Sequence, residues 1–77
     1  MNNTNTLAIG RREYQVISTE NKVNNFGQAQ TWTDLRGKRG AEVVLVETHC
    51  KYGTVATLIH FGRMSPRETI DAALIRR

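Results

Sequence analysis

The side chains of this sequence that could most readily bind a metal or act as a nucleophile are those of His49, Cys50 and His60. A zinc site needs three or four such ligands, usually in spaced pairs. His49 and Cys50 are adjacent, so they point to opposite faces of an extended chain, and too few ligands remain. A catalytic cysteine needs a cationic pocket or a helix N-terminus to stabilise its thiolate. We therefore expect no metal, no cofactor and no catalysis: the protein is predicted not to be an enzyme.

The carboxylates and glycines do not form a catalytic motif either. Asp34, Glu42 and Glu47 alternate with apolar residues, as expected of side chains that face solvent. The sequence Gly37-Lys38-Arg39-Gly40 is not a phosphate-binding loop, because no Gly-Lys-Ser/Thr opens a helix there. Binding, and not chemistry, is the function that these residues favour.

A basic turn at residues 36–40 is the best candidate for a binding site. Its three cations could lie along a phosphate backbone, and its glycines would let the main chain approach closely. The aromatic residues Phe26, Trp32 and Tyr52 could stack on unpaired bases, although for Trp32 a place in the core is favoured over a role in stacking. The predicted surface for nucleic acid or another partner consists of Arg11, Arg12, Trp32, Arg36, Lys38, Arg39, Lys51 and Tyr52.

The charge distribution points to the same turn. The net charge is +4, and 39% of the residues are hydrophobic. Residues 36–51 carry four cations and two acids, and residues 63–77 also carry four cations and two acids, so each segment contributes two positive charges. The other charges cancel. A local excess of this kind favours a polyanionic partner.

Length and composition predict one small domain. Residues 1–6 read as a disordered polar tail and residues 7–77 as a single β-rich domain. The tail lacks the features of a signal peptide, and no apolar run is long enough for a membrane span, so no membrane contact is expected. One cysteine cannot form an internal disulfide, which favours a cytoplasmic location. Because so short a chain has a thin core, a homodimer and a monomer both remain open.

Period-two alternation of apolar and polar residues predicts strands over residues 13–19 and 54–61. Between them, residues 28–36 and 41–48 are predicted to form the central hairpin around the basic turn. A symmetric turn would place Trp32 opposite Leu45, whereas a three-residue loop would place it opposite Val44. Both faces of residues 43–46 are apolar, so this strand should be covered on both sides.

A helix is predicted at the C-terminal end. Ser65, Pro66 and Glu68 match a capping box with proline at the first helical position. Ile70, Ala73 and Leu74 would then form one apolar face for docking on the sheet. The expected fold class is α+β, mostly β: four or five antiparallel strands in a curled sheet or small open barrel, with one C-terminal helix packed on it.

The functional hypothesis is a small, basic, non-catalytic module that contacts nucleic acid through a β-hairpin tip. One alternative is a protein-binding inhibitor or adaptor, of the type that phages or mobile elements encode to block a host complex. A further alternative is a homo-oligomeric structural or assembly subunit, which pairs by strand edges or by the Trp32 face.

Overall fold

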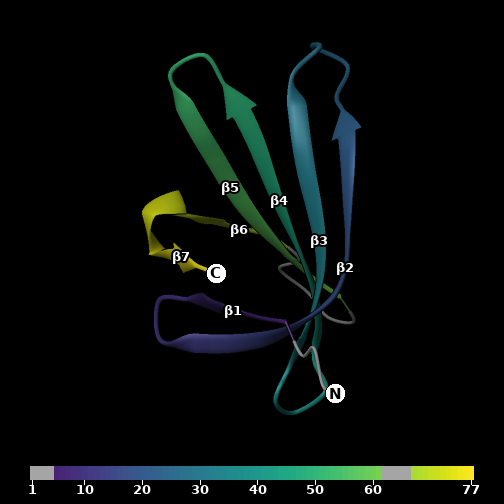
Figure 1. Cartoon of the computed structure of the whole chain (residues 1–77), viewed down its shortest axis with the longest axis vertical. Coiled ribbons are helices and arrows are strands. Elements are labelled where there is room, and N and C mark those ends of the chain that lie inside the picture. Colours follow the sequence, from purple (N-terminus) through teal and green to yellow (C-terminus); the bar gives the residue numbers. More distant parts are fainter. Residues whose placement is uncertain (1–4, 62–66) are drawn as a thin grey trace.

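The computed structural model describes residues 5–61 and 67–77 and shows a mostly β fold. Seven strands form one antiparallel sheet that curls into a half-barrel (Figure 1). This confirms the predicted curled sheet, with more strands than the four or five expected. The strands are β1 (Thr6–Ile9), β2 (Arg12–Val23), β3 (Ala29–Gly37), β4 (Glu42–Cys50), β5 (Gly53–His60), β6 (Arg67–Ile70) and β7 (Ile75–Arg76), and a 3-10 helix, η1, spans Ala72–Leu74.

The strands follow one another as a meander, and the last segment joins the two edges of the sheet. The spatial order is β6-β5-β4-β3-β2-β1-β7, so β6 and β7 are the outermost strands. The chain crosses from β6 through η1 to β7, which pairs with β1. The backbone N–H of Gly10 donates to the carbonyl of Leu74 at 3.0 Å. This crossing draws the edges together at one end of the half-barrel.

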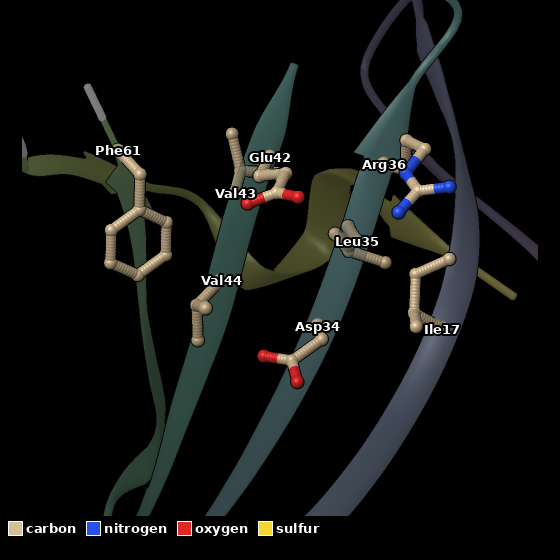
Figure 2. A pocket seen from close by; sticks show the side chains of 8 residues that line it. All are labelled: Ile17, Asp34, Leu35, Arg36, Glu42, Val43, Val44 and Phe61. Carbon is tan, nitrogen blue, oxygen red and sulfur yellow. The ribbon is translucent and has the colours of Figure 1, made fainter. Parts of the chain in front are cut away.

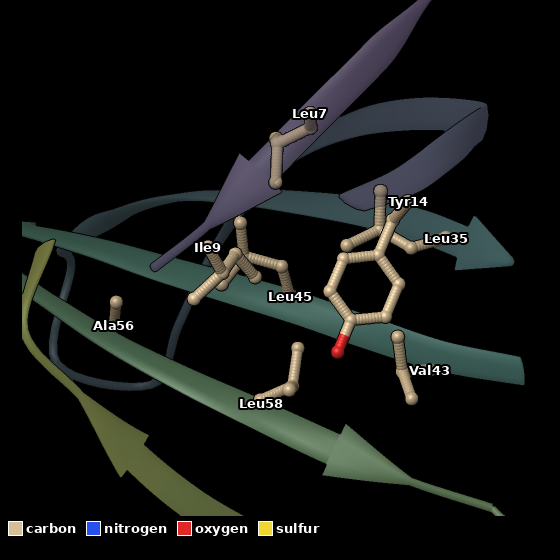
Figure 3. Packing of buried hydrophobic residues seen from close by; sticks show 8 residues of the cluster. All are labelled: Leu7, Ile9, Tyr14, Leu35, Val43, Leu45, Ala56 and Leu58. Atoms are coloured by element: carbon tan, nitrogen blue, oxygen red, sulfur yellow. The ribbon is translucent and has the colours of Figure 1, made fainter. Parts of the chain in front are cut away.

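The core lies on the inner face of the sheet at that end. There, β1 and the beginning of β2 curl over β3, β4 and β5 (Figure 3). Leu35, Leu45 and Leu58 are the largest side chains that are completely buried. Alternation along each strand accounts for the choice of residues, because every second side chain points inward. The cluster comprises Leu7, Ile9, Tyr14, Leu35, Val43, Leu45, Ala56 and Leu58.

Strand β2 is longer than the alternation predicted, and it contains a bulge. It runs to Val23, and its register with β3 shifts between Val16 and Ser18. Tyr14 and Val16 face the core, whereas the extra residue at Ile17 moves Thr19 to the inner face opposite Thr33. A bulge of this kind bends the strand. With this bend, β2 pairs with β1 over residues 12–15 and with β3 from Tyr14 onward.

Neither predicted register of the central hairpin is correct. Trp32 pairs with Val46, and Thr33 pairs with Leu45. The N–H of Gly37 donates to the carbonyl of Ala41 at 2.8 Å, and Gly40 has a φ of +85°. Residues 38–40 therefore form a three-residue loop that glycine closes in the left-handed conformation. Trp32 consequently points to the outer face and not into the core.

The predicted C-terminal helix is wrong. Ser65 and Pro66 lie outside the described residues, but Glu68 and Ile70 belong to β6, which pairs with β5 from Arg67 to Ile70. Thr69 and Ile70 are β-branched and suit a strand. Without β6, residues 56–59 of β5 would be a sheet edge with unpaired backbone groups. Pairing with that edge outweighs the local capping signal, and only the short helix η1 follows.

The predicted tail over residues 1–6 falls mostly outside the described residues, and Thr6 already belongs to β1. The alternation predicted for residues 54–61 is present in β5 and the residue after it: Ala56 and Leu58 are buried on the inner face, while Val55 and Phe61 are exposed.

Candidate nucleic-acid interface

Two basic turns lie side by side at the end of the half-barrel that holds the core. The β1–β2 turn carries Arg11 and Arg12, and the β3–β4 turn carries Lys38 and Arg39. The pairing of Tyr14 with Gly37 brings these turns together, because it aligns the start of β2 with the end of β3. Residues of both turns line one open groove of about 530 Å³.

The β3–β4 turn is held by its backbone, which leaves its side chains free for contact. The N–H of Gly40 donates to the carbonyl of Gly37 at 3.0 Å, and the N–H of Gly37 donates to Ala41. Lys38 and Arg39 at the tip are both exposed. The buried ring of Tyr14 supports the groove from the core side. The cations therefore project from a defined hairpin end.

We define the basic end as Arg11, Arg12, Arg36, Lys38 and Arg39. Acids lie among these cations: Glu13 lines the same grooves, Glu42 pairs with Arg36 across β3 and β4, and Glu68 lines a hollow with Arg11 and Arg12, but the cations still outnumber them. Lys38 Nζ lies 3.4 Å from Glu13 Oε1, but both side chains are more than half exposed, so the pair contributes little. Among the described residues, the four arginines of this set form no ion pair. The positive charge there is available to an anion.

Arg76 extends the basic end, whereas Arg77 does not. Arg76 donates through Nη2 to the carbonyl of Gly10 at 2.9 Å, which places it beside Arg11. Arg77 instead forms an ion pair with Glu47 on the inner face. Arg67 lies on β6, and Arg63 is outside the described residues.

Three residues of the predicted surface are not part of this group. Lys51 and Tyr52 form the β4–β5 turn at the opposite end of the sheet, level with the β2–β3 turn that carries Phe26 (Figure 1). Strand β4 has nine residues, so at about 3.3 Å per residue the two ends are about 27 Å apart. Trp32 lies between the ends on the outer face, where Lys22 Nζ is 4.4 Å from its ring centroid. The aromatic residues and the basic turns are thus separate.

The histidines and the cysteine have structural partners. His49 lies between the hydroxyl groups of Thr31 and Thr54, at 3.0 and 3.3 Å. His60 is 3.2 Å from a carboxylate oxygen of Glu68. Within residues 5–61 and 67–77, no three His, Cys, Asp or Glu side chains are grouped so that they could hold a metal ion.

One buried acid was not expected from the sequence. Glu47 was predicted to face solvent, yet it is 5% exposed and lies on the inner face beside the core. Its partner, Arg77, is thirty residues away in the chain. Alternation with apolar neighbours gives no sign of this burial, because Glu47 occupies the inward position of β4 where the curl of the sheet brings β7 close.

Comparisons with family models, with curated proteins and with solved structures found no match. The described part of the chain contains no helix that is long and apolar enough to cross a membrane.

Proposed function

We propose that this protein is a non-catalytic binding module that holds nucleic acid by its basic end. The observation that supports this most directly is the convergence of two turns, far apart in sequence, on one groove with Arg11 and Arg12 on one side and Lys38 and Arg39 on the other. Arginine and lysine on exposed turns are the groups that neutralise backbone phosphates.

The arrangement favours contact with the backbone and not with the bases. Phe26 and Tyr52, the most exposed aromatic side chains, lie at the far end, and the ring of Tyr14 at the groove is buried. Among the residues that line the groove, no exposed aromatic ring is therefore available to stack on bases beside the cations. Binding should be independent of sequence and strongly dependent on salt, because each neutralised phosphate releases counterions.

A test compares two double variants that remove the same charge from different places. Arg11→Ala/Arg12→Ala removes two cations from the basic end, and Lys22→Ala/Lys51→Ala removes two from elsewhere. The probe is a fluorescein-labelled 20-base-pair DNA of mixed sequence, titrated by fluorescence anisotropy from 50 to 300 mM NaCl. Removing two phosphate contacts should lower the slope of log K against log salt by up to about 1.8, while the control should keep it.

A second comparison addresses the predicted hairpin tip directly. Arg36→Ala/Lys38→Ala/Arg39→Ala should lower the slope by up to about 2.7, since three phosphate contacts are lost, and Tyr52→Ala should not change it. Equal losses for the Arg11/Arg12 and Lys22/Lys51 variants would mean that only net charge matters. That result, or no binding of the unmodified protein at 50 mM NaCl, would overturn the proposal.

A further inference from the structure

The outer face of the sheet carries an apolar surface that the described chain leaves uncovered. Val44 and Val46 point outward from β4, since the alternate residues Val43 and Leu45 point into the core. Asp34 and Ile59 flank Val44, and Trp32 flanks Val46. We define the outer apolar face as Ile17, Trp32, Val44, Val46, Ile59 and Phe61.

Large side chains on this face remain open to solvent. Val44 and Val46 are each only 7% exposed, because their neighbours in the sheet lean over them. Ile17 and Phe61, at the edges of the face, are 49% and 58% exposed. The sequence indicated that residues 43–46 need cover on both sides, and within residues 5–61 and 67–77 no second layer lies on the outer side. Exposed apolar surface of this kind marks an interaction site.

The face is hollowed towards the end that lies near the basic turns. Ile17 and Phe61 stand on opposite sides of a depression of about 240 Å³, and Val44 lies between them (Figure 2). Arg36 and Glu42 border the depression at the end near the basic turns, and Asp34 lies on its β3 side. The hollow can accept an apolar side chain of a partner.

The charges around the face indicate which kind of partner it can bind. Among the described residues, the outward positions of β2 to β6 carry Glu20, Asp34 and Glu42 against Lys22, Arg36 and Arg67, so these charges balance although the whole chain carries +4. A second copy of a basic chain can approach without repulsion only on such a neutral face. The β2–β3 side carries Glu20 and Asp34 but also Lys22 and Arg36, and Lys22 Nζ lies 3.8 Å from Glu20 Oε1. Arg67 lies on the β6 side.

We propose that the outer apolar face is the interface of a homodimer. A two-fold axis parallel to β4 lays the β2–β3 side of one copy over the β5–β6 side of the other, which brings Asp34 of one copy towards Arg67 of the other, because the two residues are level in the sheet. The same axis sets Phe61 of each copy over the hollow beside Ile17 of the other. The two copies then form a sandwich of two sheets about 10 Å apart.

The size of the face predicts a dimer of modest affinity. From Phe61 to Val55 it is about 20 Å long, and β2 to β6 cover about 19 Å at about 4.8 Å between strands. Each copy therefore buries on the order of 400–600 Å², close to the lower limit for specific interfaces. Interfaces of this size are commonly weak and transient, so half-dissociation is expected on the order of 1–100 μM.

The test is the mass in solution, measured by size-exclusion chromatography with light scattering from 5 μM to 1 mM chain. Samples contain 500 mM NaCl and are checked for the absence of nucleic acid, so the outcome does not depend on the proposed function. The mass should rise from 8.7 kDa to twice that value. Phe61→Ser should shift half-dissociation upward at least tenfold. Phe26→Ser removes an equally apolar and more exposed ring from the far end and should leave the mass curve unchanged.

Circular dichroism of both variants separates loss of dimerisation from loss of fold. Far-UV spectra that match those of the unmodified protein are expected, because Phe61 is more than half exposed. A mass of one chain at 1 mM would overturn the proposal, and so would equal effects of the two substitutions. Stable capture of a different protein on this face, with no self-association, would likewise show that the occupant is not a second copy.

Discussion

The ion pair between Glu47 and Arg77 ties the last described residue to the middle of the sheet. The Glu47 side chain is 7% exposed, whereas that of Arg77 is 57% exposed. The carboxylate therefore has lost most of its contact with water and depends on Arg77 for a charged partner. A carboxylate buried without a partner costs more free energy than the pair itself contributes.

Replacing Arg77 should consequently destabilise the fold more than replacing both partners. We expect Arg77→Ala to lower the free energy of unfolding by about 1–3 kcal/mol, a value reduced because the guanidinium is partly hydrated. Glu47→Gln/Arg77→Ala should recover part of this loss, since an amide is cheaper to bury than an unpaired carboxylate. Urea denaturation followed by far-UV circular dichroism measures both. A double variant less stable than Arg77→Ala would contradict the argument.

The β2–β3 turn shows how one side chain can define an element. Asn24 Oδ1 accepts hydrogen bonds from the backbone N–H groups of Phe26 and Gln28, both at 2.9 Å. Its Nδ2 donates to Gln28 Oε1 at 2.9 Å. Asparagine folds back on the following backbone in this way and stabilises a tight turn. The exposed ring of Phe26 is thereby held at the end of the hairpin.

Asn24→Ala should lower the free energy of unfolding by about 1–2 kcal/mol, because two backbone donors lose their acceptor. The neighbouring residue provides a matched control, since Asn25 is exposed and the structure shows no side-chain hydrogen bond for it. Asn25→Ala should stay within about 0.5 kcal/mol of the unmodified protein. Thermal and urea denaturation of the two variants test this, and equal losses would show that Asn24 has no special role in the turn.

At the scale of elements, the sequence predicted what depends on local pattern. The alternation in β5 placed Ala56 and Leu58 inside correctly, and the apolar run of β4 indicated burial on both faces. The local pattern could not predict β6, because there the local helix signal was outweighed by backbone pairing with the distant strand β5. The hairpin register failed for a local reason: the loop has three residues, as one alternative proposed, but Gly37 bonds to Ala41 and Gly40 is left-handed, so Trp32 lies opposite Val46 and not Val44.

Only part of the candidate site could be predicted from the sequence, because its geometry also depends on strand register. The basic turn at residues 36–40 was recognised from composition and Arg11 and Arg12 were included in the predicted surface, but their proximity depends on the pairing of Tyr14 with Gly37. Lys51 and Tyr52 follow β4 in sequence but lie at its other end, so nearness in sequence was misleading. Trp32 changed face with the hairpin register. Distances along a strand are readable from sequence only after the register is known.

At the scale of the whole molecule, the two proposals are connected by the direction of the two-fold axis. An axis parallel to β4 leaves the strands of both copies pointing the same way, so their basic ends lie at the same end of the dimer. A nucleic acid long enough to reach both would contact twice as many cations. Linking two binding sites in this way raises affinity without any new kind of contact.

Phe61→Ser should therefore weaken binding of the 20-base-pair DNA although it removes no charge. At chain concentrations where the unmodified protein is dimeric, the slope of log K against log salt should fall by about half, since half of the phosphate contacts are lost. A 6-base-pair DNA, which is too short to span both basic ends, should bind both proteins with the same slope. Phe26→Ser is the control and should behave as the unmodified protein on both lengths. The contrary outcome is that Phe61→Ser and Phe26→Ser have equal slopes on the longer DNA although only Phe61→Ser has lost dimerisation. The two basic ends would then be too far apart to act together. That result would require a two-fold axis perpendicular to the strands.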